Sequence, residues 1–296
     1  MNVIPYSQQY GPLSKQQIIM PQTNIIPQQI TNPSPFGGIE FVYVEDPMLE
    51  LANCTSVIIK QEPEFFEAIT GCETANRYHI FGKSPMGFKY LFKCKEKSSC
   101  FMRNFCPSGQ RAFDMEITHI NSANMINPEF TKSFANAFKP LKCTICCFCR
   151  PELNVVLNEG NGIIGSVKSV FSFCDPNFEV FDENKKLRFI VTANCCQTGL
   201  LCANKFFGKM SEVDFNILNP ENVNQIIGKI IKKSASFSEM VTDADSYIIN
   251  FPTIANTKEK LLIIALGLLI DYQYFETDSS DEKKKRKKNR GPSYHY

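Results

Sequence analysis

Two adjacent stretches of the chain read Val241-Thr-Asp-Ala-Asp-Ser-Tyr-Ile-Ile-Asn-Phe-Pro252 and Leu261-Leu-Ile-Ile-Ala-Leu-Gly-Leu-Leu-Ile270. In the first stretch Tyr247, Ile249 and Phe251 recur at every second position, which is the period of a half-buried β-strand. The second stretch is apolar on every face, which is typical of a core helix or a membrane span. The sequence therefore predicts a strand followed by one short apolar helix, and the fold of this chain has to bury all faces of that helix.

The length of the apolar stretch favours a core helix. We expect the helix to run from Thr257, as its capping residue, to Phe275. A membrane span needs about 20 apolar residues, whereas the uninterrupted run holds ten, between Lys260 and Asp271. Extending the helix past Asp271 would place a carboxylate in the bilayer, at about 2.5–3.5 kcal/mol. A β-barrel with a helix through its middle would bury every face of such a run.

Short runs of alternating apolar and polar residues fill the chain from Gly37 onward, and turn signals separate them. The expected strands lie at 78–80, 88–92, 113–117, 153–157, 164–167, 178–180, 187–191, 213–217 and 226–230. Their regular spacing predicts a mainly β protein, built as a barrel or sandwich. One further helix is expected over 62–69, because Glu62, Pro63 and Glu64 precede an apolar run that ends before Gly71.

Composition divides the 296 residues into three parts. Residues 1–36 are rich in Gln, Pro and Asn, which predicts a disordered tail that serves as a spacer or docks protein partners. Residues 37–276 form the folded domain, and residues 277–296 form a charged, disordered tail. The net charge of +2 gives no whole-protein field directed at nucleic acid. We expect no secretory signal, and hence an intracellular, reduced set of 13 cysteines.

Four sets of motifs, in the right order, resemble the phospholipid scramblase family. Gly71-Cys-Glu-Thr-Ala-Asn-Arg-Tyr78 resembles the family's G-[FC]-E-T-x-N-x-Y segment, and residues 242–252 and 270–276 resemble T-D-A-D-x-[FY]-x-I-x-F-P and I-D-[FY]-x-[FY]-F-E. Three cysteine-rich stretches match in kind and order, as do residues 213–217 and 228–230. The resemblance covers about 37–276. It implies a tubby-like fold, a closed antiparallel β-barrel of about twelve strands around a central hydrophobic C-terminal helix.

The resemblance also implies a Ca²⁺-binding segment from Asp243 to Ile254. The positions expected to supply ligands are Asp243, Asp245, Tyr247, Ile249 and Phe251. Only the two aspartates carry carboxylates, and Ile254 stands where an acidic ligand is expected. Because Ca²⁺ takes six to eight oxygens, such a site would be weak. The alternative is a purely structural strand with the two aspartates at its edge.

Four cysteines lie within seven residues, between Lys142 and Arg150: they are Cys143, Cys146, Cys147 and Cys149. Cysteines beside basic residues favour S-palmitoylation near a membrane, which the family resemblance also implies, and several acyl chains would anchor the chain firmly. A zinc site is the less favoured alternative. It would need thiolates from a second stretch, either Cys94, Cys100 and Cys106 or Cys195 and Cys196.

A dense basic run closes the chain at Lys283, Lys284, Lys285, Arg286, Lys287 and Lys288. It is interpreted as an anionic-lipid contact, a nuclear localisation signal or a solvated tail. Motifs of classical enzymes are missing: the sequence has no P-loop, no Gly-x-Ser-x-Gly and no His-Glu-x-x-His. We therefore expect that the protein neither makes nor breaks covalent bonds.

The resemblance implies a Ca²⁺-responsive phospholipid scramblase, which moves membrane phospholipids in both directions between leaflets without ATP. The expected location is the cytoplasmic face of the plasma membrane, through acylated cysteines, and the nucleus for unacylated protein. The alternative function is a lipid-anchored, tubby-like adaptor or nuclear regulator that binds lipid, protein or DNA without scrambling.

Overall fold

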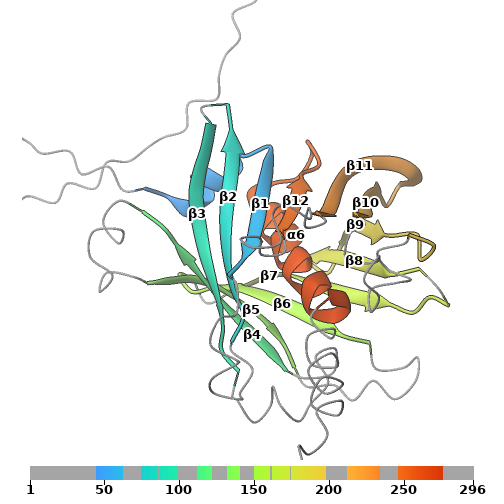
Figure 1. Cartoon of the computed structure of the whole chain (residues 1–296), viewed down its shortest axis with the longest axis horizontal. Helices are drawn as coiled ribbons and strands as arrows, with labels where there is room; N and C mark the ends of the chain where they lie inside the picture. The colour runs from blue at the N-terminus through green and yellow to red at the C-terminus, as the bar shows by residue number, and fades with distance from the viewer. Residues whose placement is uncertain are drawn as a thin grey trace, which may run out of the picture. The chain divides into compact units, whose positions relative to one another are not determined.

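Twelve antiparallel strands close into one barrel around a single long helix (Figure 1). The computed structural model describes residues 45–62, 75–85, 87–98, 112–121, 132–140, 150–160, 162–173, 175–197, 212–233 and 246–275. Strands that follow one another in sequence are neighbours in the barrel, and β1 (Ser56–Gln61) closes the ring by pairing with β12 (Ser246–Asn250). The expected closed barrel of about twelve strands around a C-terminal helix is confirmed.

The remaining strands follow in chain order, and a short helix of six residues precedes β1. The elements are α1 (Pro47–Ala52), β2 (Arg77–Ser84), β3 (Gly87–Glu96), β4 (Phe113–His119), β5 (Ser133–Lys139), β6 (Glu152–Leu157), β7 (Gly162–Val170), β8 (Asn177–Asp182), β9 (Leu187–Thr192), β10 (Val213–Asn219), β11 (Asn222–Lys233), α6 (Thr257–Ile270) and the π-helix η4 (Asp271–Phe275). Every strand that we expected from alternation lies within one of these, while β1, β5 and α1 were not predicted. The expected helix over 62–69 falls almost wholly outside the described residues.

Alternation of side chains explains why these segments form strands. In β12, Tyr247 and Ile249 are buried and the residues between them face outward. In β10 the same pattern buries Val213, Phe215 and Ile217. Each strand therefore contributes one apolar face to the interior, and closure of the ring removes the unpaired edges that an open sheet would expose.

The helix α6 begins at a capping box. The side chain of Asn256 accepts a hydrogen bond from the Glu259 backbone N–H, and the Glu259 carboxylate accepts one from the Asn256 backbone N–H. The N-cap is therefore Asn256. The expectation from the sequence, that Thr257 caps the helix, was wrong. The Glu259 carboxylate is buried and also accepts a hydrogen bond from Arg188, which joins the start of α6 to β9.

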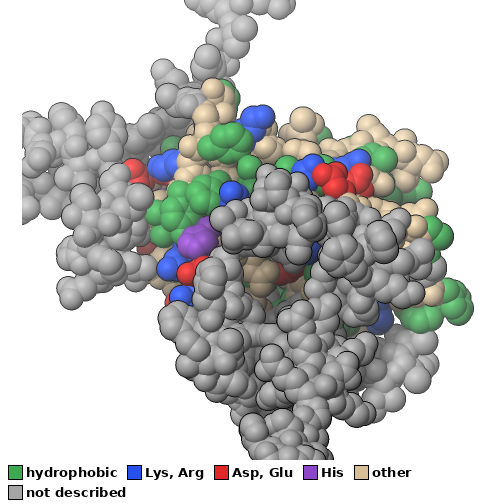
Figure 2. Space-filling model, in the orientation of Figure 1, with side chains coloured by type: hydrophobic (Ala, Val, Ile, Leu, Met, Phe, Trp, Pro, Cys, Tyr) green, Lys and Arg blue, Asp and Glu red, His purple; other side chains and the backbone are tan. Residues whose placement is uncertain are grey.

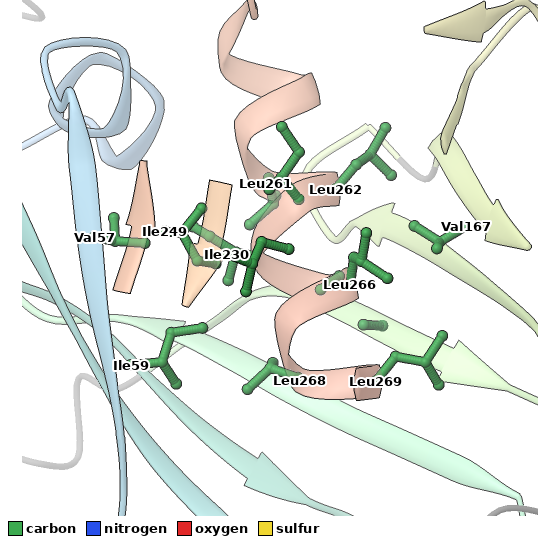
Figure 3. Packing of buried hydrophobic residues seen from close by; sticks show 14 of the residues in the cluster. Val57, Ile59, Val167, Ile230, Ile249, Leu261, Leu262, Leu266, Leu268 and Leu269 are labelled. Carbon is green, nitrogen blue, oxygen red and sulfur yellow. The ribbon is translucent and has the colours of Figure 1, made fainter. Parts of the chain in front are cut away.

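The helix α6 fills the barrel. Every residue from Leu261 to Ile270 is buried, and Figure 3 shows leucines of α6 surrounded by inward-facing residues of several strands. Each fully buried Leu or Ile contributes about 1.5–3 kcal/mol. This confirms the core-helix prediction over the membrane span. No helix within the described ranges is long and apolar enough to cross a membrane.

A glycine allows α6 to approach β7. Gly165 has a φ of +155°, and a Cβ there would lie 2.3 Å from the Phe181 carbonyl oxygen and 2.7 Å from a Leu262 methyl carbon. Any larger side chain would clash both with the neighbouring strand and with the helix. The close approach of helix and barrel wall thus depends on this one residue lacking a side chain.

Candidate functional site

The predicted functional segments are flanked by strands that end on one side of the barrel. In an up-and-down barrel, connections alternate between the two ends. Lys139 and Arg150, which flank the cysteine cluster, lie at the same end as Lys233 and Ser246, which flank the segment containing the predicted calcium aspartates. The C-terminus of α6 lies at this end too, since Tyr78 and Tyr247 of the strand ends contact Asp271. We call it the Asp271 end.

Three of the predicted sites fall outside the described residues. These are the cysteines at 143, 146, 147 and 149, the aspartates at 243 and 245, and the basic run at 283–288. Acylation, the calcium carboxylates and the basic-tail contact therefore stay predictions. The described residues that flank these segments all lie at the Asp271 end.

The other predicted calcium positions belong to the barrel core. Tyr247 and Ile249 of β12 face inward, with exposed fractions of 1% and 0%, and Phe251, just after the strand, is 8% exposed. The strand expected from their alternation is confirmed. The Tyr247 hydroxyl donates a hydrogen bond of 2.6 Å to the carboxylate of Asp271. That hydroxyl therefore serves the interior of the barrel.

Asp271 is the centre of a buried polar cluster at the end of α6. It is 2% exposed, and its two carboxylate oxygens accept hydrogen bonds from Tyr247 and, at 2.7 Å, from Tyr78. The Lys232 ammonium lies 3.8 Å from the same carboxylate and donates a 3.2 Å hydrogen bond to the Tyr247 hydroxyl. An isolated buried carboxylate would be very unfavourable, and these partners offset the cost of burying Asp271.

Aromatic rings enclose the lysine of this cluster. The Lys232 ammonium lies 4.2 Å from the centre of the Phe275 ring and 5.0 Å from that of Tyr247. A cation over a desolvated ring face is stabilised by the ring quadrupole. The cluster therefore connects β2, β11, β12 and η4, and it fixes the C-terminal end of α6 against three strands.

A second buried carboxylate lies at the same end of the barrel. Glu96 is 2% exposed and accepts hydrogen bonds from the backbone and side-chain amides of Asn76, at 3.1 and 3.0 Å. Ser98 donates to its other oxygen. Both buried carboxylates are thus held by donors that lie in or next to the strand ends, an arrangement that orders the barrel end. Sequence reasoning did not find Tyr78, Lys232 or Glu96, because the barrel alone brings them together.

The described cysteines differ sharply in their surroundings. Cys54 and Cys94 are free and buried, and burial raises the pKa of both thiols. Cys196 is free and exposed, whereas Cys195 is disulfide-bonded, which corrects the expectation of a fully reduced set. Cys94 faces the core and Cys195 is already bonded, so neither presents a ready thiolate to a zinc ion. Within the described segments no three His, Cys, Asp or Glu side chains are grouped to hold a metal ion.

Comparison with known proteins identifies the family. A family model described as Scramblase matches residues 40–277. Phospholipid scramblase 1 of Homo sapiens is 30% identical over 238 residues, which cover 79% of this chain and 67% of that protein. Phospholipid scramblase 1 of Mus musculus is 29% identical over 242 residues, and phospholipid scramblase family member 5 of Homo sapiens is 29% identical over 251 residues.

The extent of these matches differs between relatives. The match to the mouse protein covers 79% of this chain but only 65% of that protein, whereas the match to family member 5 covers 84% of each. No solved structure matches the chain significantly. The family model spans most of the chain, including all twelve strands and α6. The chain therefore belongs to the phospholipid scramblase family.

Proposed function

We propose that this protein moves phospholipids between the two leaflets of a membrane, in both directions, without ATP and in response to Ca²⁺. The observation that carries the proposal is the family model over residues 40–277, together with relatives named phospholipid scramblases. No bond is made or broken in such a transfer, so the protein needs no acid–base or nucleophilic residues. The buried carboxylates Glu96 and Asp271 are held in place by hydrogen-bond donors. Such a structural role is consistent with a protein that uses no acid–base chemistry.

The packed interior restricts where lipid headgroups travel. The barrel is filled by α6, whose residues from Leu261 to Ile270 are all buried. A charged headgroup inside that core would lose its hydration without gaining partners, at a cost of many kcal/mol. In this proposal the headgroups move past the outer surface of the protein, and α6 stays in place.

Calcium would act at the Asp271 end, through Asp243 and Asp245. Because the Tyr247 hydroxyl points inward to Asp271, the two aspartates and backbone oxygens are the ligands left for the ion. Replacing both with Asn should weaken Ca²⁺ binding about tenfold or more, a loss of about 1.4 kcal/mol. Calorimetry checks this. Unchanged thermal stability in EDTA is expected, and a lower melting temperature would instead indicate a structural role for the two aspartates.

Attachment to the membrane would come from palmitoylation of Cys143, Cys146, Cys147 and Cys149. The burial of Cys94 and the bonded state of Cys195 favour acylation over zinc. Changing all four to Ala should move the protein from the cytoplasmic face of the plasma membrane to the cytosol and nucleus, while Cys196→Ala is the matched control. Unchanged membrane fractionation would contradict the proposal, as would stoichiometric zinc in the purified protein.

Reconstitution separates scrambling from the alternative of a lipid-anchored adaptor. The full chain is placed in liposomes that carry a fluorescent phospholipid in both leaflets, and dithionite then bleaches the outer leaflet. A scramblase exposes inner-leaflet label as well, so bleaching should exceed half when Ca²⁺ is present and ATP is absent. Bleaching that stops at half, with the protein bound and folded, would support an adaptor.

A further inference from the structure

A row of apolar side chains crosses the outer surface of the barrel. On the outer face, Phe81 of β2 lies between two cross-strand partners. These are Tyr90 of β3 and Ile58 of β1. The Tyr90 and Phe81 rings stack with centres 5.0 Å apart, and the Tyr90 hydroxyl lies 2.6 Å from Nδ1 of His79. Adjacent strands are about 4.8 Å apart, so the row is continuous across the three strands.

Basic side chains flank the apolar row, two lysines on one side and one lysine on the other. On the side nearer the Asp271 end, Lys93 is opposite His79, and His79 is opposite Lys60. On the other side Lys83 is opposite Phe88, a phenylalanine that is 63% exposed. We call this surface the β1–β3 face: Ile58, Lys60, His79, Phe81, Lys83, Phe88, Tyr90 and Lys93. Figure 2 shows hydrophobic side chains gathered over β2 and β3, beside a histidine and several basic side chains.

The lysines of the β1–β3 face have no carboxylate partner among the described residues. Lys60, Lys83 and Lys93 are exposed and form none of the ion pairs seen in the described ranges. Elsewhere on the barrel surface, Lys229 and Lys233 are paired with Asp214 and Glu212. Among the described residues, the three lysines of the β1–β3 face therefore keep a positive charge that no ion pair neutralises.

Histidine adds little charge to this face near neutral pH. Burial lowers the pKa of His79, and Lys93 lowers it further, although Glu62 acts in the opposite direction. Glu62 lies at the margin of the face, 3.7 Å from Arg77 and 3.9 Å from His79. The positive charge of the face is therefore that of its lysines, which changes little in the physiological pH range.

We propose that the β1–β3 face docks onto an anionic phospholipid surface, with Phe88 entering the interface and Lys60, Lys83 and Lys93 contacting lipid phosphates. Aromatic rings with a polar tip, such as Tyr90, are favoured at the membrane interface. The inference rests on the proposed function, because it assumes that the chain works on a membrane. It adds the face, the lipid charge and the orientation of the barrel, which the family does not supply.

The curvature of the barrel limits the face to about three strands. Twelve strands share a full turn, so each strand turns the surface by about 30°. Outward residues farther round, such as Ile248 of β12 and Ile231 of β11, continue the apolar row but point away from a flat surface. The lipid contact is therefore centred on β2 and flanked by β1 and β3.

The opposite side of the barrel provides matched controls. The strand β7 is six positions from β1 in the ring of twelve. It carries Ile163, which is 53% exposed, and the exposed Lys168, while exposed Lys186 lies just before β9. Replacing both Lys83 and Lys93 with Ser should weaken binding of the full chain to phosphatidylserine vesicles about tenfold or more. Lys168→Ser with Lys186→Ser removes the same charge and should have little effect.

A single tryptophan reports the contact directly, because the natural sequence contains none. Phe88→Trp and Ile163→Trp are compared on vesicles of phosphatidylserine with brominated acyl chains, which quench tryptophan at the depth of about 5–10 Å that interfacial side chains reach. Phe88→Trp should be quenched strongly and Ile163→Trp weakly. Equal quenching, no quenching at Phe88→Trp, or failure of the folded chain to bind these vesicles would overturn the inference.

The same vesicles separate this inference from the proposed function. If labelled lipid is scrambled while Phe88→Trp is not quenched, the docking face is wrong and the function stands. If Phe88→Trp is quenched while no lipid crosses, docking stands and scrambling fails. Equal binding to neutral phosphatidylcholine vesicles would contradict the role of the lysines, as would binding that the Lys83 and Lys93 changes leave intact.

Discussion

At the scale of single residues, Asp271 determines how α6 ends. An acidic group at a helix C-terminus is opposed by the helix dipole, and this one is also 2% exposed. Tyr78, Tyr247 and Lys232 compensate, with two hydrogen bonds and a 3.8 Å ion pair. The carboxylate thereby becomes the point at which the helix is fastened to β2, β11 and β12.

Removing this carboxylate should destabilise the barrel strongly. Asp271→Ala removes the ion pair to Lys232, whose side chain is 12% exposed, and the hydrogen bonds that two tyrosines donate to Asp271. We therefore expect the free energy of unfolding to fall by about 3–5 kcal/mol. Asp214→Ala, which breaks a half-exposed pair with Lys229, should cost about 1 kcal/mol or less. Urea denaturation followed by circular dichroism compares the two, and similar losses would contradict this view of Asp271.

Thiol reactivity tests the burial of the cysteines. Since burial raises the pKa of Cys94 and Cys54, little thiolate forms at either residue near pH 8, and access is blocked as well. Cys196 is exposed. Of the three described free cysteines, we expect an alkylating reagent to label Cys196 first, and Cys94 only after denaturant is added, as peptide mass spectrometry would show. Early labelling of Cys94 in the folded chain would mean that β3 does not face the core there.

At the scale of elements, α6 is the one on which all the others depend. Its residues have no polar face, so the helix is stable only where strands surround it on all sides. The closed barrel supplies that surrounding, and Gly165 lets the wall approach the helix closely. Helix and barrel are therefore expected to fold as one cooperative unit.

A charge in the middle of α6 tests this cooperativity. Leu266→Asp would bury an unpaired carboxylate in the centre of the barrel, and we expect the whole domain to unfold, with loss of the far-UV β signal. Leu266→Met, which conserves volume, should cost less than about 1.5 kcal/mol. Wild-type β structure in the Leu266→Asp protein would show that α6 is not part of the core.

The sequence predicted most elements, and the misses have physical reasons. Strong alternation of bulky residues identified ten of the twelve strands, and the apolar run identified α6. The strand β5 was missed because its inward residues include the small Ala135 and Ala137, which give little hydrophobic contrast. The N-cap was placed one residue late, because Asn256 and Thr257 are both good capping residues and only the Glu259 hydrogen bonds decide between them.

The described part of the site could not be predicted from local patterns. The Tyr78 and Asp271 side chains that meet at 2.7 Å are 193 residues apart in sequence, and only closure of the ring brings them together. The β1–β3 face likewise depends on the register of three strands and on a bulge in β3 beside Phe81. Family motifs, in contrast, identified candidate functional segments of the chain but did not indicate which side chains are in contact.

At the scale of the whole molecule, the barrel is wrapped around its own C-terminal helix, and we propose that it attaches to a membrane from outside. The segments expected to carry calcium and acyl chains are tethered at the Asp271 end, and the β1–β3 face is the proposed lipid contact. Both assignments require that α6 stays inside the barrel when the protein is on the membrane. A helix that left the barrel would expose an empty apolar interior, which is very unfavourable.

We expect α6 to keep its place inside the barrel when the protein is bound to a membrane. Tyr272→Trp places the chain's only tryptophan at a fully buried position just after α6. Its fluorescence is measured on vesicles whose lipids carry bromine at the centre of the bilayer. We predict the same emission and the same lifetime as in solution, because the barrel wall keeps the lipid chains away. Strong quenching on membrane binding would contradict the account, since it would place the end of α6 in the bilayer.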